Sequence, residues 1–168
     1  MTKQSINLTR PGTLAEVMQL TLGNKQDFRF FLAGFLDDFY VDDSLAGRRA
    51  RIEDDPGISN DQKLDALIGA IGEHLCHRWQ LGIPPAWTEH PGRFLNHFWF
   101  FGEENDKAEF LRDSPSAYRR RMIFTEAEPL RRARMPRDGR WWAYEQLRGG
   151  LVPTPEEVEE FSKKPSPY

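Results

Sequence analysis

The sequence DFRFFLAGFLDDFY, residues 27–40, is the strongest helix signal in the chain. Large apolar side chains recur in it at spacings of three and four residues, which places them on one face of an α-helix. Either Asn24 or Asp27 can cap its start. A stripe this dense is more typical of a core than of a ligand groove or a partner face. We therefore expect its members to form the core: Phe28, Phe31, Leu32, Phe35, Leu36 and Phe39.

A second apolar stripe predicts a helix that starts near residue 60 and runs to Gly82. Ser59 and Gln62 have the spacing of a capping box at its start. Its apolar face consists of Leu64, Leu67, Ile68, Ile71, Leu75 and Trp79. We expect the two long helices to pack against each other in antiparallel order. Four side chains should lie between them: Phe31, Phe35, Leu67 and Ile71.

Weaker signals complete an all-α fold, a compact helical domain. Thr13 and Glu16 form a capping box for a short helix that ends at Gly23, and Ser44 begins another helical segment. No pair of alternating runs joined by a hairpin turn predicts a sheet. Residues 88–101 are rich in aromatic side chains without one clear period, which predicts an irregular lid.

The expected organisation is a flexible leader at 1–12, one helical domain at 13–148 and a C-terminal arm at 149–168. The arm should hold a short acidic helix that begins at Thr154. The length of 168 residues and 39% hydrophobic content suit one soluble globular domain. With Cys76 as the single cysteine, no membrane span and no secretion signal, the sequence predicts a cytoplasmic protein without disulfides.

The stretch SPSAYRRRMIFTEAEPLRRAR, residues 114–134, concentrates the distinctive chemistry. Ser114 followed by Pro115 predicts a helix start, and Thr125 with Glu128 predicts a second one. Three consecutive arginines cannot share one helix face. Partner-binding candidates are Tyr118, Arg119, Arg120, Arg121, Phe124, Arg131, Arg132 and Arg134, with Trp99 and Phe100 of the lid.

An alternative is that these arginines neutralise the protein's own carboxylates. The charge is strongly segregated, because residues 37–61 hold eight acidic side chains whereas residues 112–140 hold nine arginines against four acids. Both interpretations stay open at this stage.

Glu73, His74 and His77 are weak candidates for a metal site, because they lie close together on the second long helix. The H-E-x-x-H order is absent, and no second cluster supplies further ligands. Histidines near a helix C-terminus also interact favourably with the helix dipole. We therefore expect no metal and no other cofactor.

The order of the motifs resembles a family of small antitoxin-like bacterial proteins, often encoded beside nucleotidyltransferase-like toxins of the abortive-infection type. The resemblance covers roughly residues 13–134 and rests on DFRFFLAGFLDDFY, KLDALIGAIGEHLCHRWQL, PPAW and SPSAYRRRMIF. The last segment matches the signature Ser-Pro-x-x-Phe/Tyr-Arg-Arg-Arg-x-Ile/Val-Phe at Ser114, Pro115, Tyr118, Arg119, Arg120, Arg121, Ile123 and Phe124. The resemblance implies a protein that restrains an enzyme encoded by an adjacent gene.

Three classes of function remain. A non-enzymatic binding protein is the leading hypothesis, since it needs no catalytic set. A nucleic-acid-binding protein is the alternative, with the arginine clusters at 48–51, 119–121 and 131–134 as phosphate contacts. An enzyme comes third, because the sequence holds no glycine-rich phosphate loop and no G-x-S-x-G motif. A membrane partner is not expected, and an oligomer is compatible with the sequence.

Overall fold

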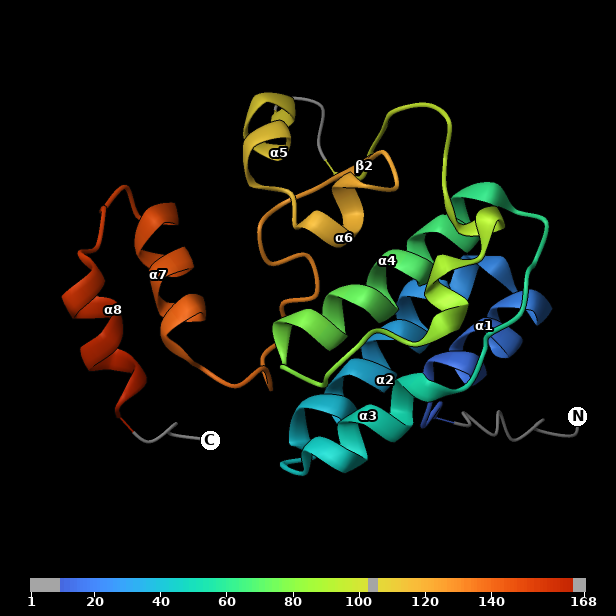
Figure 1. The fold of residues 1–168 in the computed structure, drawn as a ribbon, viewed down its shortest axis with the longest axis horizontal. Helices are drawn as coiled ribbons and strands as arrows, with labels where there is room; N and C mark the ends of the chain where they lie inside the picture. The colour runs from blue at the N-terminus through green and yellow to red at the C-terminus, as the bar shows by residue number, and fades with distance from the viewer. Residues whose placement is uncertain (1–9, 103–105, 165–168) are drawn as a thin grey trace, which may run out of the picture.

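The computed structural model describes residues 10–102 and 106–164, and within them it confirms the all-α class. Figure 1 shows α4 in the middle of a helical body, with α7 and α8 to one side. The helices are α1 (Leu14–Gly23), α2 (Phe28–Val41), α3 (Leu45–Glu53), α4 (Gln62–Arg78), α5 (Lys107–Asp113), α6 (Ser116–Arg119), α7 (Gly139–Arg148) and α8 (Pro155–Ser162). Single 3-10 turns lie at Lys25–Asp27, Ala86–Glu89 and Pro91–Arg93. The strands are β1 (Trp99–Phe100) and β2 (Ile123–Phe124).

Side-chain caps set most helix starts. The predicted capping box of Thr13 and Glu16 begins α1, and the Ser44 hydroxyl accepts a hydrogen bond from the backbone N–H of Gly47 at the start of α3. The capping box predicted at Ser59 is wrong, because Asp61 caps α4 instead. The Ser59 hydroxyl donates to the buried carboxylate of Asp65, at 2.8 Å, and is therefore engaged inside the loop.

The helix α4 also ends earlier than predicted. It stops at Arg78, and Trp79 is its C-cap. Gln80 follows with a φ of 55°, a left-handed conformation that a continuing helix cannot accommodate. The sequence had suggested Gly82 as the end, since glycine is the usual residue at such a position.

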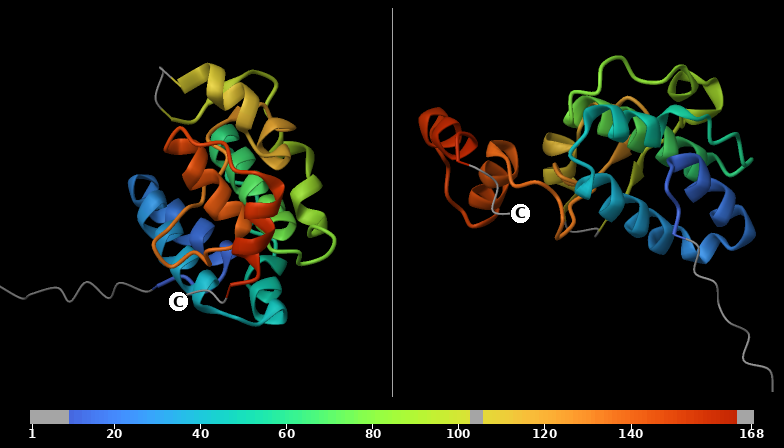
Figure 2. Two further views of the ribbon diagram at one scale, coloured as in Figure 1. Left: turned by 90° about the vertical axis from the view of Figure 1, so that its left-hand side faces the viewer. Right: turned by 90° about the horizontal axis from the view of Figure 1, so that it is seen from below.

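The two long helices are parallel, so the predicted antiparallel order is wrong. Lys25, just before α2, forms an ion pair with Asp61, just before α4. At the other end, the ring of Tyr40 in α2 meets the ring of Trp79 after α4, with centroids 5.6 Å apart. The intervening α3 runs back between the end of α2 and the start of α4, which makes the parallel arrangement possible (Figures 1 and 2).

The core lies where α1, α2 and α4 meet. Three of the four side chains predicted for the contact between the long helices are buried in one apolar cluster: Phe35, Leu67 and Ile71. The fourth, Phe31, is only partly buried and packs against that cluster. The aromatic stripe of α2 is therefore core toward its C-terminal half, while its N-terminal half borders a cleft.

The aromatic lid contains a short strand that the sequence did not predict. The strands β1 and β2 are parallel, and the N–H groups of Trp99 and Phe101 donate to the carbonyls of Met122 and Phe124, both at 2.8 Å. Parallel strands have no hairpin turn between them, and two residues are too few for a recognisable alternation.

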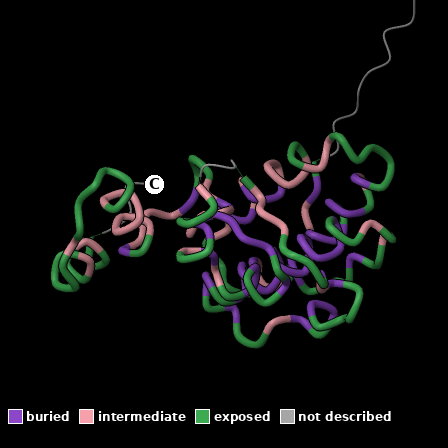
Figure 3. Tube along the Cα trace, turned by 90° about the horizontal axis from the view of Figure 1, so that it is seen from above, coloured by how far each residue is buried: buried purple, intermediate pink, exposed green. Residues whose placement is uncertain are grey.

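The helices α7 and α8 form a hairpin beside the body (Figure 2). The rings of Trp142 and Phe161 stack at 5.4 Å between them. Figure 3 shows few buried positions in the hairpin, and Gly139 is the one buried residue within its two helices. The predicted acidic helix is present with its capping box at Thr154. The sequence placed α7 in the main domain and the arm from residue 149, whereas in the structure α7 pairs with α8.

The predicted leader at 1–12 lies largely outside the described residues, as do residues 165–168. Within the described part, Arg10 forms ion pairs with Asp37 and Asp38 of α2. None of the helices in residues 10–102 and 106–164 combines the length and the apolar character that crossing a membrane requires.

Replacing Phe35 by alanine should lower the free energy of unfolding by about 3–5 kcal/mol, because the fully buried ring would leave a cavity. Phe30→Ala on the same helix is the control, since that ring is 57% exposed and its loss should cost no more than about 0.5 kcal/mol. Urea denaturation of both variants measures the difference. A loss below about 1 kcal/mol for Phe35→Ala would contradict the assignment of this residue to the core.

Candidate functional site

The side chains of the three consecutive arginines differ in burial and in their hydrogen-bond partners. Arg121 is fully buried, and its guanidinium donates to the Glu73 carboxylate and to the backbone carbonyls of Ala117 and Thr88. It also lies over the ring of Phe94, 4.7 Å from the centroid. The side chain of Arg121 therefore links α6 and the turn at Ala86–Glu89 to α4, and it is not part of the protein surface.

Arg120 and Arg119 lie nearer the surface. Arg120 is half-exposed and bridges two carboxylates, at 3.2 Å from Glu73 and 2.6 Å from Glu89. Arg119 is exposed and donates to the carbonyls of Arg112 and Ser114, at 3.0 and 3.1 Å. For Arg120 and Arg121 the structure thus favours the second sequence interpretation, the neutralisation of the protein's own acids.

The local fold around these arginines differs from the prediction. The hydroxyl of Ser114 does not cap a helix, because it lies 2.6 Å from the carbonyl of Phe110 and accepts from the N–H of Thr125 at 2.8 Å. The helix α6 is a single turn, and Met122 after it has a φ of 60°. This left-handed residue turns the chain into β2, where Ile123 is buried.

The second arginine cluster is also largely paired. Arg131 forms an ion pair with Glu145 of α7 at 2.6 Å. Arg132 donates two hydrogen bonds to Asp37 of α2, at 3.0 and 2.7 Å. Within residues 10–102 and 106–164, Arg134 is exposed and makes no ion pair.

The capping box predicted at Thr125 and Glu128 is wrong, since no helix follows. Glu128 is buried, accepts a hydrogen bond from Arg78 at 3.0 Å and forms an ion pair with Arg140 at 3.0 Å. Arg78 also donates to Asp138 with two hydrogen bonds, at 2.6 and 2.8 Å. These four side chains fasten the α7–α8 hairpin to the end of α4.

Their pKa values reflect this arrangement. Burial raises the pKa of Glu128 above its ordinary value although Arg78 opposes the shift. Burial acts in the same direction on Asp138, but its hydrogen bonds from Arg78 outweigh it and lower the pKa of that carboxyl. This network is not predictable from the sequence pattern, because Arg78 lies in a helix and arginine is usually solvent-exposed there.

The three weak metal candidates do not converge on one point. Glu73 is engaged by Arg120 and Arg121, and His77 is exposed. His74 is buried, with its ring 5.6 Å from the ring of Tyr118. The described residues include no group of three or more side chains that could hold a metal ion.

Two of the aromatic candidates point in opposite directions. Phe100 stacks on Phe124 at 5.3 Å, whereas Trp99 contacts Phe101 at 5.3 Å and both pack against the core. Phe98 meets Phe124 on the outer side at 5.4 Å and is 65% exposed. We call Phe98 and Phe100, with the buried Phe124 beneath them, the aromatic patch.

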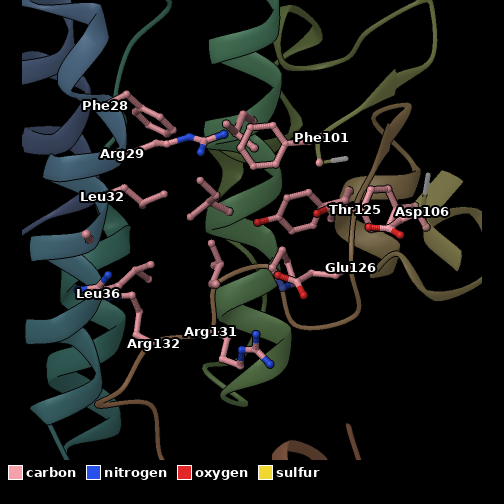
Figure 4. Close-up of a pocket in the computed structure, with 18 residues that line it drawn as sticks. Phe28, Arg29, Leu32, Leu36, Phe101, Asp106, Thr125, Glu126, Arg131 and Arg132 are labelled. Carbon is pink, nitrogen blue, oxygen red and sulfur yellow. The ribbon is translucent and has the colours of Figure 1, made fainter. Parts of the chain in front are cut away.

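A cleft of about 470 Å³ separates α2 from the segments on the other side of α4. In Figure 4, Phe28, Leu32 and Leu36 line the α2 side, and Phe101, Asp106 and Thr125 lie opposite. Arg131 and Arg132 lie toward the end occupied by Leu36. Tyr118, a predicted partner contact, is buried and contributes to the wall of this cleft.

The comparisons with known proteins found no match: no family model, no curated protein and no solved structure resembles the chain above the threshold for significance.

Glu73→Gln should lower the free energy of unfolding by about 3 kcal/mol, because it leaves the buried guanidinium of Arg121 without a counter-charge. Glu89→Gln is the matched control. Glu89 is 54% exposed and, among the described residues, forms an ion pair with Arg120 alone, so its change should cost less than about 1 kcal/mol. Chemical denaturation at neutral pH compares the two. Equal losses would show that the Glu73–Arg121 pair has no special structural role.

Acid should destabilise the protein through His74. Burial, assisted by the charges of Arg140 and Arg78, lowers the pKa of this imidazole from 6.5 to about 3. The unfolded chain therefore binds the proton first, and the stability present above pH 6.5 is lost as the pH falls. From about pH 7.5 to about pH 5 the loss should be about 2 kcal/mol.

His74→Phe keeps a ring beside Tyr118 and removes the titration, so its stability should stay nearly constant over that range. His77→Gln, on the exposed side of the same helix, should retain the wild-type slope. Urea denaturation at several pH values measures both. A wild-type slope in the His74→Phe variant would assign the acid sensitivity to other groups.

Proposed function

We propose that this chain is a cytoplasmic, non-enzymatic binding protein of the antitoxin-like type, which restrains a nucleotidyltransferase-like enzyme encoded by an adjacent gene. The observation that carries the proposal is the aromatic patch, in which Phe100 of β1 and Phe98 just before it both pack on Phe124. The resemblance of residues 114–124 to the antitoxin-like signature supplies the kind of target.

The aromatic patch has the character of an interface anchor. Phe98 is mostly exposed, and Phe100 is half-exposed and stacks on Phe124. Aromatic side chains are enriched at protein interfaces and often dominate their binding energy. The backbone hydrogen bonds between β1 and β2 hold the patch in place, so little order has to be gained on binding.

The arginines of the signature then have two roles. Arg121 and Glu73 fix α6 and β2 on α4, and so position the patch from inside. Arg119 stays exposed, and so does Arg134 of the second cluster. Guanidinium groups bind carboxylates well, and the carboxylates that hold metal in a nucleotidyltransferase would be suitable partners for them.

Internal pairing weighs against the nucleic-acid alternative. Of the three clusters considered as phosphate contacts, each gives part of its charge to the protein itself: Arg48 to backbone carbonyls, Arg121 to Glu73, and Arg132 to Asp37. Binding to phosphates depends on the number of available cations. A protein partner uses the exposed aromatic rings, for which duplex DNA offers no equivalent pocket.

The test is coexpression with the product of the adjacent gene, followed by size-exclusion chromatography. Changing Phe98 and Phe100 together to serine should abolish coelution, because it removes the aromatic anchors. Ile83→Ser is the control. Ile83 is 85% exposed and lies in the loop between α4 and the turn at Ala86–Glu89, outside the aromatic patch.

Coelution that survives the double change would place the interface elsewhere. An absence of any complex with the product of either neighbouring gene would overturn the antitoxin-like proposal. Tight binding of generic DNA that weakens steeply with salt would instead favour the nucleic-acid alternative.

A further inference from the structure

We infer that the cleft between α2 and the segment 125–132 is a binding site for a small amphipathic anion, with an apolar body and one carboxylate group. This inference concerns a different surface from the aromatic patch and does not depend on the proposed partner. It rests on the size of the cleft, the chemistry of its walls and a buried tyrosine in its wall whose hydroxyl has no partner among the described residues.

The size and the walls suit a small organic molecule. A volume of about 470 Å³ falls within the range of ligand pockets, which are mostly apolar with a few polar groups. Here α2 contributes Leu32 and Leu36 and α4 contributes Leu67 and Ile71, all of which line the cleft.

The hydroxyl of Tyr118 is the second observation. Tyr118 belongs to the cleft wall and is only 1% exposed. Its oxygen has no hydrogen-bond partner among the described residues, in contrast to the hydroxyl of Tyr40, which donates to the carbonyl of Leu130 at 2.7 Å. Buried hydroxyls are nearly always paired, so an unpaired one in a cleft wall indicates a ligand that accepts its hydrogen bond.

Charge decides the class of ligand. Three arginines line the cleft, and two of them are committed, Arg131 to Glu145 and Arg132 to Asp37. Arg29 differs, because within the described residues it contacts the ring of Phe101, at 5.4 Å from the centroid, and no carboxylate. Figure 4 shows its side chain reaching from α2 toward Phe101 across one end of the cleft.

Two carboxylates also line the cleft, and their positions indicate at which end of the cleft an anion would bind. Glu126 accepts a hydrogen bond from Tyr144 at 2.6 Å and lies toward Arg131 in Figure 4. Asp106 lies on the side opposite Leu32. Anion binding is thus favoured at the Arg29 end, where Phe28 and Phe101 provide apolar surface beside the guanidinium. We place the ligand's carboxylate between Arg29 and the hydroxyl of Tyr118, because it is the only acceptor of such a ligand, and its apolar body along Leu32 and Leu36.

The test is isothermal titration calorimetry on the full chain with dodecanoate as the anionic probe and dodecanol as its neutral counterpart. We expect dodecanoate to bind more tightly than dodecanol. Arg29→Met should weaken dodecanoate by about tenfold and leave dodecanol unchanged, because it removes the charge and keeps the apolar stem. Tyr118→Phe should weaken the better-bound probe by about fivefold, the effect of one neutral hydrogen bond.

Leu32→Trp fills the cleft from α2 and should abolish binding of both probes, while Ile83→Trp adds the same ring in a distant loop and should leave binding intact. Circular dichroism verifies that each variant is folded. If the wild type binds neither probe, the proposal is overturned. Binding that persists in Leu32→Trp and is insensitive to Tyr118→Phe would show general surface association and would overturn it as well.

Discussion

The buried carboxylate of Glu73 is the constraint on which the middle of this structure depends. Burying a charge is costly unless the charge is paired and hydrogen-bonded. Glu73 meets this condition because Arg120 and Arg121 both reach it from the segment after α6. Arg121 in turn donates to the carbonyl of Thr88, so one cluster joins α4, the turn at Ala86–Glu89 and α6. The small sheet follows from this cluster, since β2 starts two residues after Arg121.

Elsewhere in the molecule, other buried arginines hold irregular backbone segments in place by donating hydrogen bonds to their carbonyls. Arg93 donates to the carbonyls of Trp87 and Gly57, and Arg48 donates to the carbonyls of Phe39 and Asp42. A guanidinium has five N–H donors in a fixed plane, which suits it to carbonyls that no helix or sheet satisfies. Long connections between the helices are thereby held without regular structure. In the arginine-rich stretch, Arg121 and Arg132 are likewise engaged within the fold, by Glu73 and Asp37.

Periodicity and capping chemistry predicted most of the helices, because both depend on neighbours along the chain, whereas α5 was not predicted. The stripe of α2 and the capping boxes at Thr13 and Thr154 are local features of this kind, and the structure confirms them. The two wrong capping boxes share a cause, since Ser59 and Glu128 are each engaged by a residue outside the predicted cap, Asp65 and Arg78 respectively. Glu128 fits a capping box by spacing, yet its carboxylate accepts a hydrogen bond from Arg78 of α4.

The direction of α4 relative to α2 is decided by the return path through α3, which apolar spacing does not encode. The proposed sites share this property, because the patch needs β2 beneath β1 and the cleft needs Tyr118 beside α2.

The two proposed sites are adjacent, because successive side chains at the end of β1 point to opposite sides of the backbone. Phe100 belongs to the aromatic patch, whereas the next residue, Phe101, lines the cleft beneath Arg29. A ligand and a protein partner would thus contact opposite faces of the same backbone. Coupling between two sites requires an element with two arrangements whose equilibrium both ligands shift. Here the N–H groups of Trp99 and Phe101 are bonded to β2, and β2 is anchored by the fully buried Ile123. A strand fixed in this way has little freedom to transmit a change, so the geometry favours two sites that bind independently although they are only one residue apart.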